Sequence, residues 1–122
     1  MEEQAKIRPL RFIGSSHSDL KSFPRKVRSE IGQALYAAQV GKTDPAAKPL
    51  KGFGGGSVME IVAPFHGEAW RTVYTVRFAG AVYVLHAFQK KSKSGIATPK
   101  KELDLIQARL ADAQRDYRRR QN

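Results

Sequence analysis

The chain has 122 residues and no cysteine, and its 22 Lys and Arg residues exceed its 11 Asp and Glu residues, giving a formal net charge of +11. This length suits one domain, residues 1–122, with a single core. The lack of cysteine excludes disulfides and thiolate metal sites. The charge indicates a polyanionic partner: nucleic acid or an acidic protein, before an anionic membrane surface.

The chain begins MEEQAKIRPL, which contains no apolar segment of the kind that a signal peptide requires. No apolar run approaches the ~20 residues that a membrane helix needs. We therefore expect a cytoplasmic protein with no membrane partner.

The first elements are a strand and two helices. The pattern over residues 6–13 predicts a strand. Because proline has no amide donor, Pro9 predicts that this strand lies at a sheet edge or starts after Pro9. After a turn at 14–18, Ser18 is expected to cap a short helical segment over 19–23. Pro24 suits the first turn of a longer helix, which Gly41 ends. Its apolar positions recur at helical spacing and predict one buried stripe: Val27, Ile31, Ala34, Leu35 and Ala38.

The middle of the chain is a connection rich in proline, glycine and lysine, residues 42–57. It does not match a phosphate-binding P-loop, because no Lys-Ser/Thr pair follows the glycines at the required spacing. Residues 58–63 then predict a short strand, and residues 64–67 predict a turn.

Residues 70–88 contain two runs of β-branched and aromatic residues separated by Ala79-Gly80. This pattern predicts a β-hairpin in which Gly80 supplies a positive φ. If Phe78 pairs with Ala81, one face is nearly all apolar and covers a core, and the other is a working surface. The apolar face carries Trp70, Thr72, Tyr74, Val76, Phe78, Ala81, Tyr83, Leu85 and Ala87. The working surface carries Arg71, Val73, Thr75, Arg77, Val82, Val84, His86 and Phe88.

A last helix is expected to start with Thr98 as its cap and Pro99 at its first position. Its apolar residues recur at intervals of three and four and predict one buried seam: Leu103, Ile106, Leu110, Ala113 and Tyr117. The element order predicts an α+β fold: a small antiparallel sheet with two N-terminal helices packed on one face, and a C-terminal helix.

Five segments together resemble the HigB-like, phage-derived branch of the RelE/ParE toxin superfamily. They are Phe23-Pro24, KPLKGFGGG at 48–56, VMEIV at 58–62, WRTVYTVRF at 70–78 and VLHAFQKKSKSGIATPKKEL at 84–103. The last segment is the most specific.

This resemblance implies the toxin of a type II toxin–antitoxin pair, an endoribonuclease that cuts mRNA, usually on the ribosome. It also implies an antitoxin partner, commonly with a helix-turn-helix domain. Some superfamily members instead bind DNA gyrase and cut nothing, so the fold does not decide the chemistry. A third reading is a basic nucleic-acid-binding module without enzymatic activity.

RNA is cut without a metal when its 2′-OH attacks the adjacent phosphodiester, which needs a base, an acid and charge stabilisation. We predict four catalytic residues: Arg71, His86, Lys90 and Lys91. The Arg71 guanidinium suits a phosphate clamp. Either lysine is a candidate base, because crowded cations favour its neutral form. His86 suits an acid or a base.

Four further residues are predicted to bind RNA: Lys51, Arg77, Phe88 and Lys93. Phe88 or Tyr74 is expected to stack on a base, although the assumed register puts Tyr74 on the buried face. No cofactor is expected. The three histidines lack metal-ligand spacing, and no carboxylate cluster suggests a two-metal nuclease. A simpler interpretation gives these residues no catalytic role: the lysines after the second strand form a solvated loop, and His86 is a half-buried, hydrogen-bonded residue.

Overall fold

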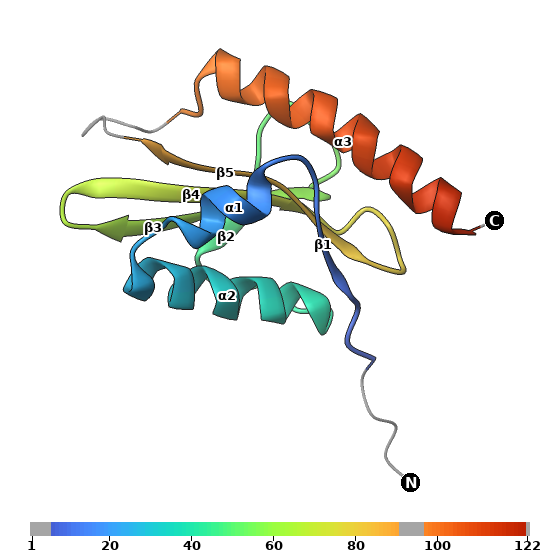
Figure 1. Ribbon diagram of the computed structural model, residues 1–122, viewed down its shortest axis with the longest axis horizontal. Helices are drawn as coiled ribbons and strands as arrows, with labels where there is room; N and C mark the ends of the chain where they lie inside the picture. The colour runs from blue at the N-terminus through green and yellow to red at the C-terminus, as the bar shows by residue number, and fades with distance from the viewer. Residues whose placement is uncertain (1–5, 91–96, 122) are drawn as a thin grey trace, which may run out of the picture.

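Five strands form one sheet in the order β1-β5-β4-β3-β2, with helices on both faces. The computed structural model describes residues 6–90 and 97–121. Figure 1 shows α2 and α3 on opposite sides of the sheet. The elements are β1 (Leu10–Phe12), α1 (Ser16–Lys21), α2 (Arg25–Gln39), β2 (Ala47–Pro49), β3 (Val58–Phe65), β4 (Glu68–Thr75), β5 (Val82–Lys90) and α3 (Lys100–Gln121).

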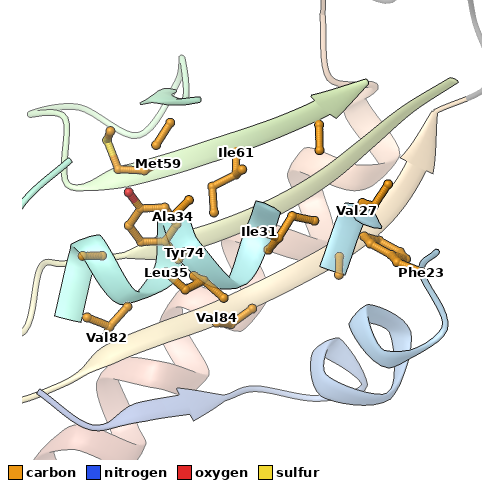
Figure 2. Close-up of a cluster of buried hydrophobic side chains, with 14 residues drawn as sticks. Phe23, Val27, Ile31, Ala34, Leu35, Met59, Ile61, Tyr74, Val82 and Val84 are labelled. Atoms are coloured by element: carbon orange, nitrogen blue, oxygen red, sulfur yellow. The ribbon is translucent and has the colours of Figure 1, made fainter. Parts of the chain in front are cut away.

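The predicted α+β class is confirmed, and so is the stripe on α2. Its five apolar positions are all buried, and they pack with strand residues such as Tyr74 and Val84 in one core (Figure 2). Gly41, which follows the C-cap residue Val40, has a φ of +82°, and its N–H donates to the carbonyl of Ala38. The left-handed end that glycine permits is therefore present as predicted.

A second core lies between the other face of the sheet and α3. Ile106, Leu110 and Ala113 of α3 are buried there, with Tyr117 partly buried. The predicted seam is thus confirmed. It covers much of the face expected to be an open working surface, so that expectation is wrong: Val73 and Phe88, both assigned to that surface, belong to this second core.

The β4–β5 pairing follows the expected register only as far as Val73, which lies opposite His86. A bulge follows, and Tyr74 pairs with Val84 instead of with Leu85. An extra residue in one strand exchanges the faces of all residues beyond it. Tyr83 and Leu85 therefore face α3, whereas Val82 and Val84 face α2.

Gly80 does not have the positive φ that the turn was expected to need. Its N–H donates to the hydroxyl of Tyr117 over 3.0 Å. A Cβ at this position would lie 2.9 Å from that hydroxyl oxygen. The space for a side chain at this position is limited by Tyr117 of α3 rather than by the turn.

The sheet is mostly antiparallel, but β1 pairs in parallel with β5. β1 lies at the sheet edge and starts directly after Pro9, so both alternatives drawn from Pro9 are confirmed, although the strand is shorter than residues 6–13. β3 extends through Pro64 to Phe65, so the expected turn at 64–67 shrinks to His66-Gly67, both with positive φ. Pro64 is tolerated because β2 pairs with β3 only at Met59–Ile61, leaving β3 one neighbour there.

Candidate functional site

A cavity of about 460 Å³ lies on the α3 face of the sheet, between the β2 edge and the start of α3. We call it the basic cavity. Its lining residues are Lys48, Pro49, Leu50, Lys51, Glu60, Val62, Arg71, Ala97, Thr98 and Leu103. The volume is that of an ordinary small-molecule or nucleotide-sized site.

Strand register brings the charged lining residues together. Lys48 of β2 lies opposite Glu60 of β3, and Val62 of β3 lies opposite Arg71 of β4. Directly paired residues share a face, and alternate residues along a strand do too. Lys48, Glu60 and Arg71 therefore converge on one face of three adjacent strands.

A buried ion pair forms the floor of the basic cavity. Nη1 of Arg71 donates to Oε1 of Glu60 over 2.9 Å, and the two side chains are 5% and 11% exposed. The other carboxylate oxygen, Oε2, accepts a hydrogen bond of 2.8 Å from the Thr98 hydroxyl. Thr98 was expected to cap α3, but its hydroxyl binds Glu60 instead. One carboxylate thus joins β3, β4 and the residues preceding α3.

Glu60 was missed by the sequence analysis. The signal was present: an acidic residue stands inside the apolar run VMEIV. A charge in a buried strand requires a partner, and arginine is the usual one. Lys48, which lines the cavity opposite Glu60, was missed for a simpler reason: a three-residue edge strand in a proline-rich connection gives little periodicity to detect.

Lysines lie at the mouth of the basic cavity. Lys48 and Lys51 are exposed and line it. Lys90, at the end of β5, is partly buried and donates from Nζ to the carbonyl of Ala97, itself a lining residue. Of the predicted site residues, Arg71 and Lys51 therefore line the cavity and Lys90 adjoins it. Lys91 and Lys93 lie outside the described residues.

His86 and Phe88 lie beside the basic cavity, under α3, and do not line it. Their rings stack with centroids 4.7 Å apart, and the residues are 6% and 8% exposed. Nε2 of His86 lies 2.9 Å from Oε1 of Glu102 on α3. Arg109 donates to the carbonyl of Leu85 over 3.0 Å and approaches Nδ1 of His86 at 3.4 Å. These contacts fasten α3 to β5, and Phe88 is buried rather than exposed for stacking on a base.

Arg77 is exposed and does not line the basic cavity. It donates to the Ser57 hydroxyl over 3.1 Å and to the carbonyl of Phe53 over 3.4 Å, so it holds the glycine-rich connection against the sheet. Tyr74 is 1% exposed on the α2 face, as the assumed register implied. Burial, reinforced by the negative charge of Asp44, raises the pKa of Tyr74 to about 12. Neither residue is placed to touch a ligand in the cavity.

A separate polar network fastens the far end of α3. The Tyr83 hydroxyl donates to Asp116 over 2.6 Å and accepts from Arg11 over 3.1 Å. Burial and this bond to Asp116 raise the pKa of Tyr83. The bond from Tyr83, followed by that from Arg120, lowers the pKa of Asp116. With His86–Glu102 near one end and Tyr83–Asp116 near the other, polar contacts fix both ends of α3 on β5.

The part of the chain that the structure describes holds no group of three or more His, Cys, Asp or Glu residues arranged to bind a metal ion. Over residues 6–90 and 97–121, no helix has the length and apolar character needed to cross a membrane.

Residues 18–111 match the family model described as "Phage derived protein Gp49-like (DUF891)". No curated protein sequence matches the chain. Among solved structures, the fold is similar to a chain in the crystal structure of the toxin–antitoxin complex RelBE2 from Mycobacterium tuberculosis. That alignment has 14% identity and a TM-score of 0.47, and covers 75% of this chain and 100% of the other. Because the family match spans most of its length, the chain belongs to the phage-derived Gp49-like family.

Proposed function

We propose that this protein is the toxin of a type II toxin–antitoxin pair and that it inhibits translation by cutting mRNA, on the ribosome, without a metal. The observation that carries the proposal is the basic cavity, which combines two exposed lysines at its mouth with a buried arginine at its floor. The net charge of +11 and the motif resemblance to HigB-like toxins support the same assignment.

The reaction that fits this set of residues is internal transesterification. The ribose 2′-oxygen attacks the adjacent phosphorus, the bond from phosphorus to the 5′-oxygen breaks, and a 2′,3′-cyclic phosphate and a 5′-OH remain. The base takes the proton of the 2′-OH, and the acid returns a proton to the departing 5′-oxygen. Negative charge builds up on the phosphorane oxygens, so fixed cations lower the barrier.

We assign the roles by position. Lys48 and Lys51, exposed at the mouth, bind the phosphates on either side of the cut. Arg71 supplies positive charge from the floor, where low solvent access strengthens its effect. The base and the acid are drawn from Lys90, which adjoins the cavity through Ala97, and Lys91, its neighbour in the sequence.

His86 has a different role in this proposal. Since His86 and Phe88 are buried under α3 and do not line the cavity, they act on it indirectly. By binding Glu102, His86 fixes the first turn of α3, which contributes Leu103 to the cavity wall.

The proposed partners follow from charge. The antitoxin is expected to cover the basic cavity with an acidic or apolar segment and to carry a helix-turn-helix domain. While it is bound, RNA cannot reach Lys48 and Lys51, so the toxin is inactive.

The test is to express the protein without its antitoxin and to map RNA 5′ ends while monitoring translation and the DNA-damage response. We expect new mRNA ends within minutes, arrested translation and no early DNA-damage response. The control is Lys26→Ala, which removes an exposed lysine on α2 and should leave cleavage intact. Growth arrest with intact mRNA and an early DNA-damage response would contradict the proposal and favour a toxin acting on gyrase.

A further inference from the structure

The basic cavity contains a carboxylate where a polyanion is proposed to bind. Glu60 binds the Arg71 guanidinium over 2.9 Å, and both side chains are nearly buried. A carboxylate and a phosphate present the same geometry to a guanidinium fork, so they compete for it. Glu60 therefore occupies a position on Arg71 that suits an oxyanion.

We propose that the Arg71 site binds one phosphate of single-stranded RNA, and that Glu60 is a built-in competitor which the phosphate displaces. This inference rests on the proposed RNA substrate. Exchange of one anion for another keeps the guanidinium paired throughout, which avoids leaving a buried charge without a partner. Arg71 is reached from the cavity side, because it belongs to the cavity lining.

The neighbours of Glu60 make the exchange feasible. Lys48 lies directly opposite Glu60 across the β2–β3 pair and is exposed. The Cβ atoms of such a pair are about 5 Å apart, so a displaced carboxylate has a cation within reach. When the Glu60 carboxylate leaves Arg71, it can therefore move toward Lys48 and solvent.

Displacement of Glu60 also affects the residues before α3. The second carboxylate oxygen holds the Thr98 hydroxyl at 2.8 Å, and Thr98 lines the basic cavity. When Glu60 moves, this bond is lost. Binding of a phosphate at the floor is thus coupled to release of the cavity wall at Thr98.

The probe is a labelled 2′-O-methyl RNA oligomer, which binds but cannot be cut because it lacks the attacking hydroxyl. Its affinity for the full chain is measured by fluorescence anisotropy over a range of salt concentrations. Glu60→Gln should bind it about tenfold more tightly. The slope of log K against log salt should steepen by up to about 0.7, because the phosphate at Arg71 no longer releases a carboxylate whose charge offsets its own.

Two comparisons separate a local effect from a general one. Asp104→Asn removes an exposed negative charge on the first turns of α3, and it should change affinity less than twofold. In the double variant Glu60→Gln/Arg71→Gln the gain should disappear, because the guanidinium for which Glu60 and the phosphate compete is absent. Equal gains for Glu60→Gln and Asp104→Asn, or a gain that survives in the double variant, would overturn the inference.

Thr98→Val gives a second test that changes no charge. It removes the hydrogen bond that holds Glu60 in place, so RNA should bind more tightly by a few fold with an unchanged salt slope. Unchanged or weaker binding would contradict the exchange even if Glu60→Gln does not fold. None of these measurements requires cleavage, so they test the displacement of Glu60 independently of the proposed nuclease activity. If the variants change RNA affinity as expected but the wild type does not cut mRNA, the phosphate site is supported and the nuclease activity is contradicted.

Discussion

Glu60 and Arg71 form an ion pair of 2.9 Å at the floor of the basic cavity, with side chains that are 11% and 5% exposed. Each comes from a central strand of the sheet, and the carboxylate also holds Thr98. This pair determines both the stability of the cavity and its affinity for anions, so the first prediction concerns it.

Glu60→Ala should destabilise the fold by about 3–5 kcal/mol, because it leaves a buried guanidinium without its carboxylate. Glu60→Gln should cost less, since the amide oxygen still accepts a hydrogen bond from Arg71. Chemical denaturation followed by circular dichroism measures both free energies of unfolding. Equal, small losses for the two variants would show that the pair contributes little.

Lys51→Ala should weaken RNA binding without loss of stability, because Lys51 is exposed and lines the basic cavity. The salt slope for single-stranded RNA should fall by about 0.7, the contribution of one phosphate contact. Lys26→Ala, the control on α2, should leave the slope unchanged. If the two variants behave alike, the cavity is not where RNA binds.

Gly80→Ala should destabilise the protein by about 1–3 kcal/mol, since the added methyl group would lie 2.9 Å from the Tyr117 hydroxyl oxygen. Tyr117→Phe removes that oxygen. The double variant should therefore lose less stability than the sum of the two single variants. Thermal unfolding of the wild type, the two single variants and the double variant measures this coupling. Strictly additive losses would contradict the close approach of Gly80 and Tyr117.

Stability should decrease at alkaline pH, in part because of Tyr74. Its pKa rises from 10.0 to about 12 in the folded protein, mainly through burial. Between these values the unfolded chain loses the proton and the folded one keeps it, so stability falls as pH rises from 10 to 12. Tyr74→Phe should flatten this part of the pH profile, whereas Tyr36→Phe, at an exposed tyrosine, should not.

The sequence predicted the helices best, because their patterns are long and periodic. All five stripe positions of α2 are buried, and the α3 seam packs on the sheet. Membership of a phage-derived family was also predicted and is confirmed by the family match. Helical spacing repeats over several turns, so one atypical residue does not change the interpretation.

The sheet was harder to predict, for identifiable reasons. The bulge between Val73 and Tyr74 exchanges the faces of the remaining β5 residues, and alternation alone cannot show where an extra residue falls. The parallel pairing of β1 with β5 joins segments distant in the sequence, and local patterns contain no such information. His86 and Phe88 looked like an open surface because nothing in their own strand shows that α3 covers them.

The most direct test of the central claim is cleavage of a defined mRNA in a translating extract, with ends mapped after adding wild type, Lys51→Ala or Arg71→Gln. We predict discrete cuts bearing 2′,3′-cyclic phosphate and 5′-OH ends with the wild type. Both variants should cut at least ~100-fold more slowly, which is the scale expected for loss of a transition-state contact, and circular dichroism checks that each variant is folded. Full-length mRNA with the wild type, or undiminished cutting by both variants, would contradict the assignment of the basic cavity as the active site.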